Sequence, residues 1–386
     1  MAVAKSRSKL WFALHGWMAL PVWLFLLFIC LTGTICTIDR EILWLFDPSV
    51  RAANPDALPR KPLNDVIAAV ERQIAGAHVN NIRFGEPFMA LEVGLSTPDA
   101  PMATAWVNPF SGTVQSVVTG TTFPNFIRGL HGWLLLPWSN GTSIGWYAVC
   151  LMALPLMGSV VTGLVIYKRF WRAFTAPRLR RGNGARVFWG DFHRLAAVWG
   201  LWFMVTISLT GLWFLVEGVM YELNIPLAVE GPDIAAGEAP SRPAGAPLPR
   251  MDVDAAVARA VARNPGISPL MVGLPEHALG TAEIYSRSTF PLLMEVVWVH
   301  PYSGAVVGWR DAGNAGTTEI INALNASLHY GNFAGLGVKL IWTLFGTLLS
   351  GLVCSGTVIW TKRTAQVTRT LISRPAPAAL ATESAS

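Results

Sequence analysis

The sequence predicts an α-helical membrane protein: a four-helix transmembrane bundle that carries two small α+β domains outside the membrane. Three observations support this fold class. Charged residues make up only 13% of the 386 residues, against 52% hydrophobic ones, whereas about a quarter of the positions in soluble proteins are charged. Four long stretches contain no charged residue at all. The chain also contains the same motifs twice in the same order, which indicates an internal parallel duplication.

Each charge-free stretch is long enough for one membrane crossing, because a spanning helix needs about 20 apolar residues. The stretches are 10–38, 129–167, 195–216 and 340–361. The second contains Pro, Ser, Asn and Gly at 137–141, so we expect its transmembrane helix to begin near 144. The first follows three basic residues, as a signal peptide does, but its apolar core is too long and no small-residue cleavage site follows.

Lys and Arg are unevenly distributed between the segments that flank these helices. Residues 1–9, 168–194 and 362–386 hold 15 Lys and Arg against two acidic residues, a net charge of +13. Residues 39–128 and 217–339 hold 14 against 21, a net charge of −7. Because Lys and Arg stay on the cytoplasmic side of a membrane, we expect both termini in the cytoplasm and both long segments outside. The overall charge of +6 is then a topology signal, and no nucleic-acid partner is needed to explain it.

These features divide the chain into eight segments. They are transmembrane helix 1 (11–38), exterior domain 1 (39–128), an interfacial helix with transmembrane helix 2 (129–168), a cytoplasmic loop (169–190), transmembrane helix 3 (191–217), exterior domain 2 (218–318), an interfacial helix with transmembrane helix 4 (319–361) and a cytoplasmic tail (362–386). Each exterior domain combines an amphipathic helical run, 63–74 or 253–262, with alternating strands. All four cysteines lie in charge-free stretches, so we expect no disulfide in the exterior domains.

Three pairs of motifs recur in the two halves with closely similar spacing. In each half an aromatic or aliphatic residue and a histidine are followed, sixteen residues after the histidine, by L-T-G. A turn with Pro, Ser and Gly lies in each exterior domain, and an L-H pair precedes the second helix of each half. The matched segments are Leu14-His15 with Phe192-His193, Leu31-Thr32-Gly33 with Leu209-Thr210-Gly211, 107–114 with 299–306, Leu130-His131 with Leu328-His329, and Gly163 with Gly356.

The turn V-x-P-x-S-G-x-V in a small α+β unit, flanked by L-H near a helix start and L-T-G near its far end, resembles the PepSY-associated transmembrane family. The resemblance covers nearly the whole chain. Members are often called iron-regulated membrane proteins, and the chain is similar to membrane siderophore reductases such as the ferrioxamine reductase of Gram-negative bacteria. The resemblance implies PepSY-like periplasmic domains, a bacterial inner-membrane location, two haems and reduction of a ferric siderophore on the periplasmic side.

Four of the seven histidines occupy equivalent positions in the two halves. His15 and His193 begin helices at the cytoplasmic side, whereas His131 and His329 lie at the outer interface, on short interfacial helices expected at 123–136 and 319–329. A low-spin b-type haem takes two neutral imidazoles on opposite faces of its ring, held by facing helices. We therefore expect His15 and His193 to ligate one b-type haem, and His131 and His329 a second. A single interfacial histidine is more often a snorkelling residue, but the equivalent positions favour ligands.

Helical phase adds four glycines to these expected sites. Eighteen residues make five helical turns and rise about 27 Å, so Gly33 shares a face with His15, and Gly211 with His193, in the opposite leaflet. Gly163 and Gly356 lie in the returning helices near the depth of His15 and His193. We expect these glycines to line the haem cavities, and their alternative role is close helix packing.

Other cofactors and roles are less well supported by the sequence. A copper or zinc site would need Cys, Met or carboxylate groups near the histidines, and none clusters there. A quinone between the histidines stays an alternative. For His78, His277 and His300 we expect surface or turn roles. The cytoplasmic segments are too short for a nucleotide-binding domain, so the electron donor must be a separate cytoplasmic reductase or a membrane quinol.

We therefore expect transmembrane electron transfer from a cytoplasmic-side donor to a periplasmic ferric siderophore, which releases iron as Fe(II). The net-negative exterior segments suit a neutral or cationic chelate. One alternative is a membrane-anchored protein whose PepSY-like domains bind peptides or proteases without redox activity. Another is a permease, although the helices offer few polar groups to line a path.

Overall fold

The computed structural model describes residues 2–139, 141–241 and 250–372, so part of the predicted cytoplasmic tail lies outside the described residues. The chain divides into two compact units. Unit 1 consists of Met1–Cys30, Leu154–Val205 and Thr347–Ser386, and unit 2 of Leu31–Ala153 and Thr206–Gly346. Several membrane helices begin in one unit and end in the other.

Within the described residues, four helical spans are long and apolar enough to cross a membrane: Lys9–Cys36, Ile144–Ile166, Leu201–Glu222 and Gly335–Lys362. The four crossings predicted from the charge-free stretches are thus confirmed, and the protein is a multi-pass membrane protein. The third span differs in detail. Residues 195–199 belong to α9 (Ala185–Trp199), and the span itself is α10 (Leu201–Glu222), which begins after a break at Gly200.

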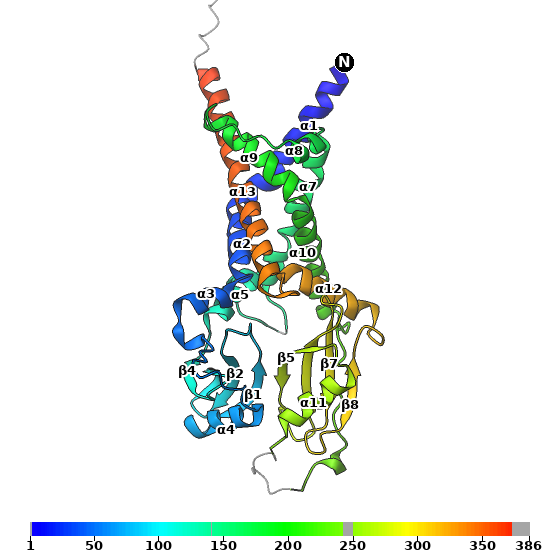
Figure 1. Cartoon of the computed structure of the whole chain (residues 1–386). Helices are drawn as coiled ribbons and strands as arrows, with labels where there is room; N and C mark the ends of the chain where they lie inside the picture. The colour runs from blue at the N-terminus through cyan, green and yellow to red at the C-terminus, as the bar shows by residue number, and fades with distance from the viewer. Residues whose placement is uncertain (1, 140, 242–249, 373–386) are drawn as a thin grey trace, which may run out of the picture. The chain divides into compact units, whose positions relative to one another are not determined.

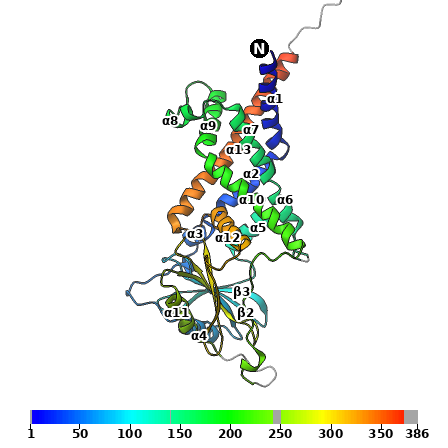
Figure 2. The same ribbon diagram turned by 90° about the vertical axis from the view of Figure 1, so that its right-hand side faces the viewer.

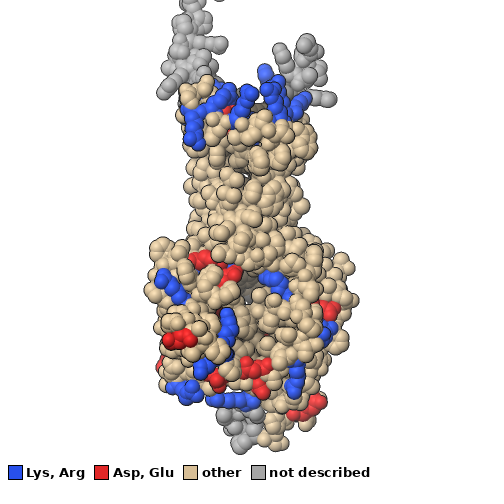
Figure 3. All heavy atoms as spheres, in the orientation of Figure 1, with Lys and Arg blue, Asp and Glu red and all other residues tan. Residues whose placement is uncertain are grey.

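The regular secondary structure in the described part of unit 1 is helical, and residues 176–184 form an irregular loop. Unit 1 contains α1 (Ala2–Ala19), the turn η1 (Leu20–Val22), the start of α2 (Trp23–Cys36), most of α7 (Ala153–Ile166), α8 (Phe170–Thr175), α9, and much of α13 (Gly335–Ile372). Pro21 separates α1 from α2, because proline cannot donate a backbone hydrogen bond to the residue four positions earlier. Figure 3 shows Lys and Arg side chains gathered at the end of this unit that carries the N-terminus.

Unit 2 is built on one eight-stranded antiparallel sheet with the order β4-β3-β2-β1-β5-β6-β7-β8 (Figure 1). The strands are β1 (His78–Arg83), β2 (Leu91–Thr97), β3 (Ala100–Val107), β4 (Val114–Thr119), β5 (Ser268–Gly273), β6 (Ala282–Arg287), β7 (Met294–Val299) and β8 (Val306–Arg310). The sequence predicted two separate exterior domains. The pairing of β1 with β5, with Ile82 opposite Val272, joins them into one sheet, and this pairing satisfies two strand edges that separate domains would expose.

Two helices cover one face of the sheet, α4 (Leu63–Gln73) and α11 (Val253–Arg263), as Figure 2 shows. Their apolar sides and alternate residues of the strands form one core, in which Ile82, Val272 and Ile284 are fully buried. The amphipathic runs predicted at 63–74 and 253–262 are these helices. The same order, one helix followed by a four-stranded meander, thus occurs in each half of the sheet.

The turns between β3 and β4 and between β7 and β8 have the same construction. Gly112 and Gly304 adopt φ angles of +74° and +69°, which glycine accepts without strain. The Asn108 side chain accepts the backbone N–H groups of the first turn, and the His300 ring accepts those of the second. His300 is buried and therefore has a structural turn role, as expected.

The remaining elements of unit 2 connect the sheet to the membrane helices. They are α3 (Asp39–Phe46), η2 (Pro48–Val50), α5 (Phe123–Trp133), η3 (Ala236–Glu238) and α12 (Thr317–Tyr330). The helix α6 (Ile144–Cys150) is instead the first part of the second membrane span. The expected interfacial helices correspond to α5 and α12. Thr122 caps the start of α5 through the Asn125 N–H, and Gly331, with a φ of 62°, ends α12.

Candidate functional site

Unit 1 brings two of the sequence-predicted histidines together. His15 lies on α1 and His193 on α9, and the centres of their imidazole rings are 6.3 Å apart at an interplanar angle of 85°. The two residues are 178 positions apart in the sequence, so their approach depends on the packing of helices from the two halves. We call this pair the inner site.

Unit 2 brings the other two histidines together in the same way. His131 lies near the end of α5 and His329 near the end of α12, with ring centres 6.3 Å apart and an interplanar angle of 33°. The edge of Phe214 packs against the His329 ring at 5.0 Å. We call this pair the outer site.

The ring separation fits two imidazoles that share one metal ion. A metal–imidazole bond of about 2.0 Å, with about 1.1 Å more from the ring nitrogen to the ring centre, places two such rings about 6.3 Å apart. Both sites have this separation. The described residues contain no group of three or more His, Cys, Asp or Glu that could hold a bare metal ion. Two imidazoles are one ligand set that a protein can offer to a haem, so the residues fit a haem at each site.

Each of the four histidines lies beside a hydroxyl group on a membrane helix. The Nδ1 atom of His15 is 2.9 Å from Thr162 Oγ1, and that of His193 is 2.9 Å from Ser355 Oγ. At the outer site, Thr32 Oγ1 is 3.2 Å from His131 Nδ1, and Thr210 Oγ1 is 2.8 Å from His329 Nδ1. A partner on Nδ1 leaves Nε2 as the nitrogen that is available to a metal.

Sequence reasoning missed these hydroxyl groups. It used the repeated L-T-G motif only for its glycine, although Thr32 and Thr210 are the middle residues of that motif. The signal was present in all four cases, because a Thr or Ser immediately precedes each of the four glycines that were singled out. The residue that each hydroxyl contacts depends on the packing of helices far apart in the sequence.

Three of the four predicted glycines lie directly beside a histidine ring. A Cβ atom at Gly33 would lie 2.7 Å from His131 Cε1, one at Gly163 would lie 3.5 Å from His15 Cε1, and one at Gly356 would lie 3.4 Å from His193 Cε1. The glycines therefore let the imidazole rings approach the neighbouring helices. Gly211 differs, because its nearest neighbour is the Cβ of Ala153, at 3.1 Å.

The other described histidines lie apart from both pairs. The side chains of His78 and His277 are exposed, and the His277 ring is 3.7 Å from the Asp233 carboxylate. His300 has the turn role described above. None of the three is within ring contact of the inner or outer pair among the described residues.

Buried carboxylates anchor two of the ligand-bearing helices. Asp39, at the start of α3, is 2% exposed and accepts two hydrogen bonds from the Arg128 guanidinium, at 2.5 and 3.3 Å. Arg128 stands one helical turn before His131 on α5. At the inner site, Asp191 on α9 is buried two residues before His193 and accepts hydrogen bonds from Arg180 and Arg194. These ion pairs fix the helices that carry the histidines.

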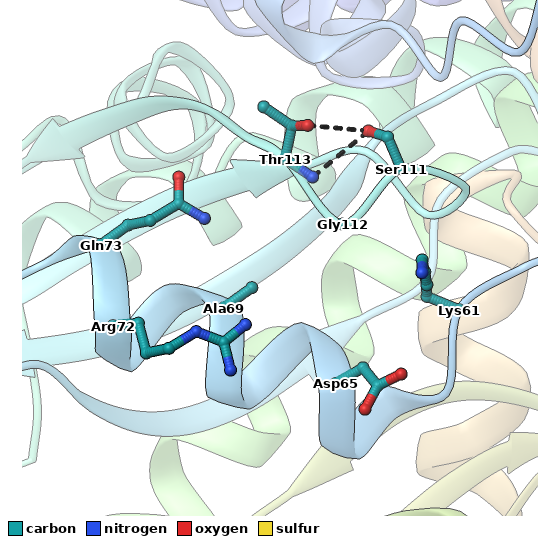
Figure 4. Close-up of a pocket in the computed structure, with 8 residues that line it drawn as sticks. All are labelled: Lys61, Asp65, Ala69, Arg72, Gln73, Ser111, Gly112 and Thr113. Carbon is teal, nitrogen blue, oxygen red and sulfur yellow. Dashed lines mark hydrogen bonds between the residues drawn. The ribbon is translucent and has the colours of Figure 1, made fainter.

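A polar cavity of about 480 Å³ lies elsewhere in unit 2, between α4 and the turn that joins β3 to β4 (Figure 4). No histidine lines it. Its lining residues are Lys61, Asp65, Ala69, Arg72, Gln73, Ser111, Gly112 and Thr113. In the other half of the sheet, the guanidinium of Arg259 reaches the turn at Ser303 and Gly304, so the two halves differ at this point.

Comparisons with known proteins support the architecture. The family described as PepSY-associated TM region matches residues 12–363, which is nearly the whole chain. A comparison with curated proteins found no match.

The Asp39–Arg128 ion pair should contribute to the stability of unit 2. We expect Arg128→Ala to destabilise the protein by about 3–5 kcal/mol, because it leaves a buried carboxylate without a partner. Arg250→Ala is the matched control. It breaks the ion pair with Glu71, in which the Arg250 side chain is 72% exposed, and solvent screening leaves such a pair with little effect. Thermal unfolding of the detergent-purified protein measures both, and equal midpoints for the two variants would contradict the anchoring role of Asp39.

Proposed function

Because the chain belongs to the PepSY-associated transmembrane family, we propose that it is a di-haem oxidoreductase of the bacterial inner membrane. It moves electrons from a donor on the cytoplasmic side to a ferric siderophore in the periplasm and releases iron as Fe(II). Membership of this family is consistent with an iron-regulated membrane protein. The two haems, the electron-transfer reaction and the ferric siderophore substrate are proposed in addition to this membership.

One observation carries the proposal: two separate histidine pairs have the same ring separation, 6.3 Å, which a shared metal ion requires. A pair of membrane histidines that merely hydrogen-bond to solvent or lipid has no reason to face another imidazole at this distance. The hydroxyl partners on all four Nδ1 atoms add to the argument, because an imidazole that is held through Nδ1 binds a metal through Nε2.

A b-type haem bound at each pair would supply a one-electron carrier whose iron alternates between the ferric and ferrous states. The protein's own residues hold, orient and enclose that group. His15 and His193 would hold the haem of the inner site, and His131 and His329 that of the outer site. Gly33, Gly163 and Gly356 keep space for the rings, and the apolar helices exclude water from both sites.

The distribution of charge supports the direction of the reaction. The basic segments favour a cytoplasmic location for both termini, where a reductase or a membrane quinol would deliver electrons. The exterior segments carry a net charge of −7 and suit a neutral or cationic ferric chelate. Each ferric ion takes up one electron, and the ferrous ion is held less tightly by the hard oxygen ligands of a siderophore.

A second candidate function is a regulatory protein that binds peptides or proteases through its PepSY-like domains and performs no redox reaction. The observation that favours it is the polar cavity beside α4, which lies in the first exterior domain and contains charged and hydroxyl groups. The two functions differ in one simple property. The regulatory protein is colourless, whereas the di-haem protein has a haem absorption band.

The ligand assignment predicts the haem content of single variants. We expect the purified protein to contain about two haems per chain, and His131→Ala and His193→Ala each to contain about one, because each removes one axial ligand of one site. His277→Ala is the matched control, since this histidine is exposed and lies outside both pairs. Pyridine haemochrome absorption measures the content. A wild-type protein without haem, or two variants with undiminished content, would refute the assignment.

The glycine contacts predict a graded effect. Gly33→Ala places a methyl group 2.7 Å from His131 Cε1, so the ring must move away from its ligating position. We expect this variant to lose the outer haem. Gly163→Ala adds a methyl group at an ordinary contact distance of 3.5 Å from His15 and should keep both haems, as should Gly16→Ala, which has no neighbour within 4 Å. Equal haem content in Gly33→Ala and Gly16→Ala would argue against a fixed His131 ring.

The reaction itself can be followed with the reduced protein. After dithionite reduction and removal of excess reductant, addition of a ferric trihydroxamate should re-oxidise the haems, and an Fe(II)-specific chelator should trap ferrous iron in equal amount. The gallium chelate of the same siderophore has the same shape and cannot be reduced under these conditions, so it should leave the haems reduced. If the ferric chelate also left them reduced, the protein would have a different electron acceptor.

A further inference from the structure

Three of the hydroxyl groups beside the histidines donate their own protons to backbone carbonyls of their helices. Thr162 Oγ1 donates to the Gly158 carbonyl at 2.6 Å, Thr210 Oγ1 to the Thr206 carbonyl at 2.8 Å, and Ser355 Oγ to the Leu352 carbonyl at 2.9 Å. A hydroxyl group has one proton to donate and lone pairs to accept. Because each proton goes to a carbonyl of the preceding helical turn, each oxygen can only accept a hydrogen bond from the histidine.

This arrangement selects one tautomer of the imidazole. A neutral imidazole carries its proton on one nitrogen and a lone pair on the other. Since the hydroxyl oxygen accepts at Nδ1, the proton of His15, His193 and His329 is on Nδ1, and the lone pair is on Nε2. Nε2 is therefore the nitrogen prepared to bind a metal ion before any cofactor arrives.

Each hydroxyl comes from the same half of the chain as its histidine. Thr32 and Thr162 serve His131 and His15 in the first half, and Thr210 and Ser355 serve His329 and His193 in the second. Each half thus builds and orients its own ligands, while each ring pair is formed between the halves. The orientation of a ligand does not depend on the other half.

We propose that Thr162, Thr210 and Ser355 are positioning residues whose hydroxyl groups hold His15, His329 and His193 in the Nδ1–H tautomer and set the midpoint potential of each site. The proposal rests on the di-haem function. An acceptor on Nδ1–H makes the imidazole a better electron donor to the metal, and this donation stabilises the ferric state. Loss of the acceptor therefore raises the midpoint potential, and the effect is confined to the site whose ligand has lost its partner.

The chemical nature of the acceptor suits the membrane. The four hydroxyl-bearing residues are between 0% and 6% exposed. In many metalloproteins the ligating histidine donates to a carboxylate, but a charge in the middle of a membrane helix is costly. A hydroxyl group whose proton satisfies a carbonyl of its own helix provides a neutral acceptor. It polarises the imidazole less than a carboxylate does, which keeps the potential higher.

The test compares Thr210→Val with Thr210→Ser. Valine has nearly the shape of threonine without the hydroxyl group, whereas serine keeps the hydroxyl and loses the methyl group. We expect Thr210→Val to raise the midpoint potential of the outer haem in a redox titration, to leave the inner haem unchanged, and to weaken haem retention about 10- to 100-fold. Thr210→Ser should restore both values. Thr37→Val is the control, because its hydroxyl bonds to Thr343 and to the Thr34 carbonyl instead.

A second site keeps the proposal testable if Thr210→Val does not fold. Ser355→Ala removes the hydroxyl partner of His193 without adding volume and leaves the backbone hydrogen bond of this ring with Leu352. Thr357→Val is its control on the same helix, since that hydroxyl bonds to the Val353 carbonyl. An unchanged midpoint potential and unchanged haem retention in Ser355→Ala and Thr210→Val would overturn the proposal while leaving the di-haem function intact. A wild-type protein without haem would instead refute the proposed function on which it rests.

Discussion

Two imidazole rings held 6.3 Å apart, at each of two places, are the constraint on which the rest of the molecule depends. The two rings of each pair come from different helices, so their geometry has to be maintained by the residues that pack behind each ring. The structure meets this need with a hydroxyl group within 3.2 Å of each Nδ1 atom and with glycines beside three of the four rings. It also uses ion pairs that fix α5 and α9 within a helical turn of their histidines.

The membrane explains why the groups that position the histidines are neutral inside the spans and charged only outside them. Charge is expensive in the bilayer, so the two buried carboxylates that anchor ligand helices, Asp39 and Asp191, lie outside the four apolar spans. Inside the spans, the polar groups that touch the histidines are neutral hydroxyls, and the helix itself satisfies the proton of three of them. Polar groups are thus available beside each histidine pair without adding a net charge to the apolar spans.

Much of this architecture could be predicted from the sequence, because it follows from local composition. Charge-free stretches gave the four spans, and the repeated L-H and L-T-G motifs indicated the histidines and glycines. The proline- and glycine-containing turns were equally local, and Gly112 and Gly304 have the positive φ angles that the sequence predicts. The start of α10 at Leu201 was less predictable, because residues 195–199 are as apolar as the span that follows them.

Features that depend on long-range packing could not be read in this way. The pairing of β1 with β5 joins segments about 190 residues apart, and either strand could equally have remained an edge. Thr32, Thr162, Thr210 and Ser355 are ordinary helix residues in the sequence, and only the packing of two helices brings each to an imidazole. Gly211 shows that equivalent positions in the repeat do not always have the same neighbours. It matches Gly33 in the repeat, yet it packs against Ala153 rather than a histidine.

The central claim, that each histidine pair shares one haem iron, is tested most directly by electron paramagnetic resonance of the oxidised, detergent-purified protein. Axial imidazole planes that are nearly parallel give a rhombic low-spin ferric signal, and planes that are nearly perpendicular give a strongly anisotropic one. The interplanar angles of 33° and 85° therefore predict one signal of each kind, in equal amounts. High-spin ferric signals alone, or no haem signal at all, would contradict the claim.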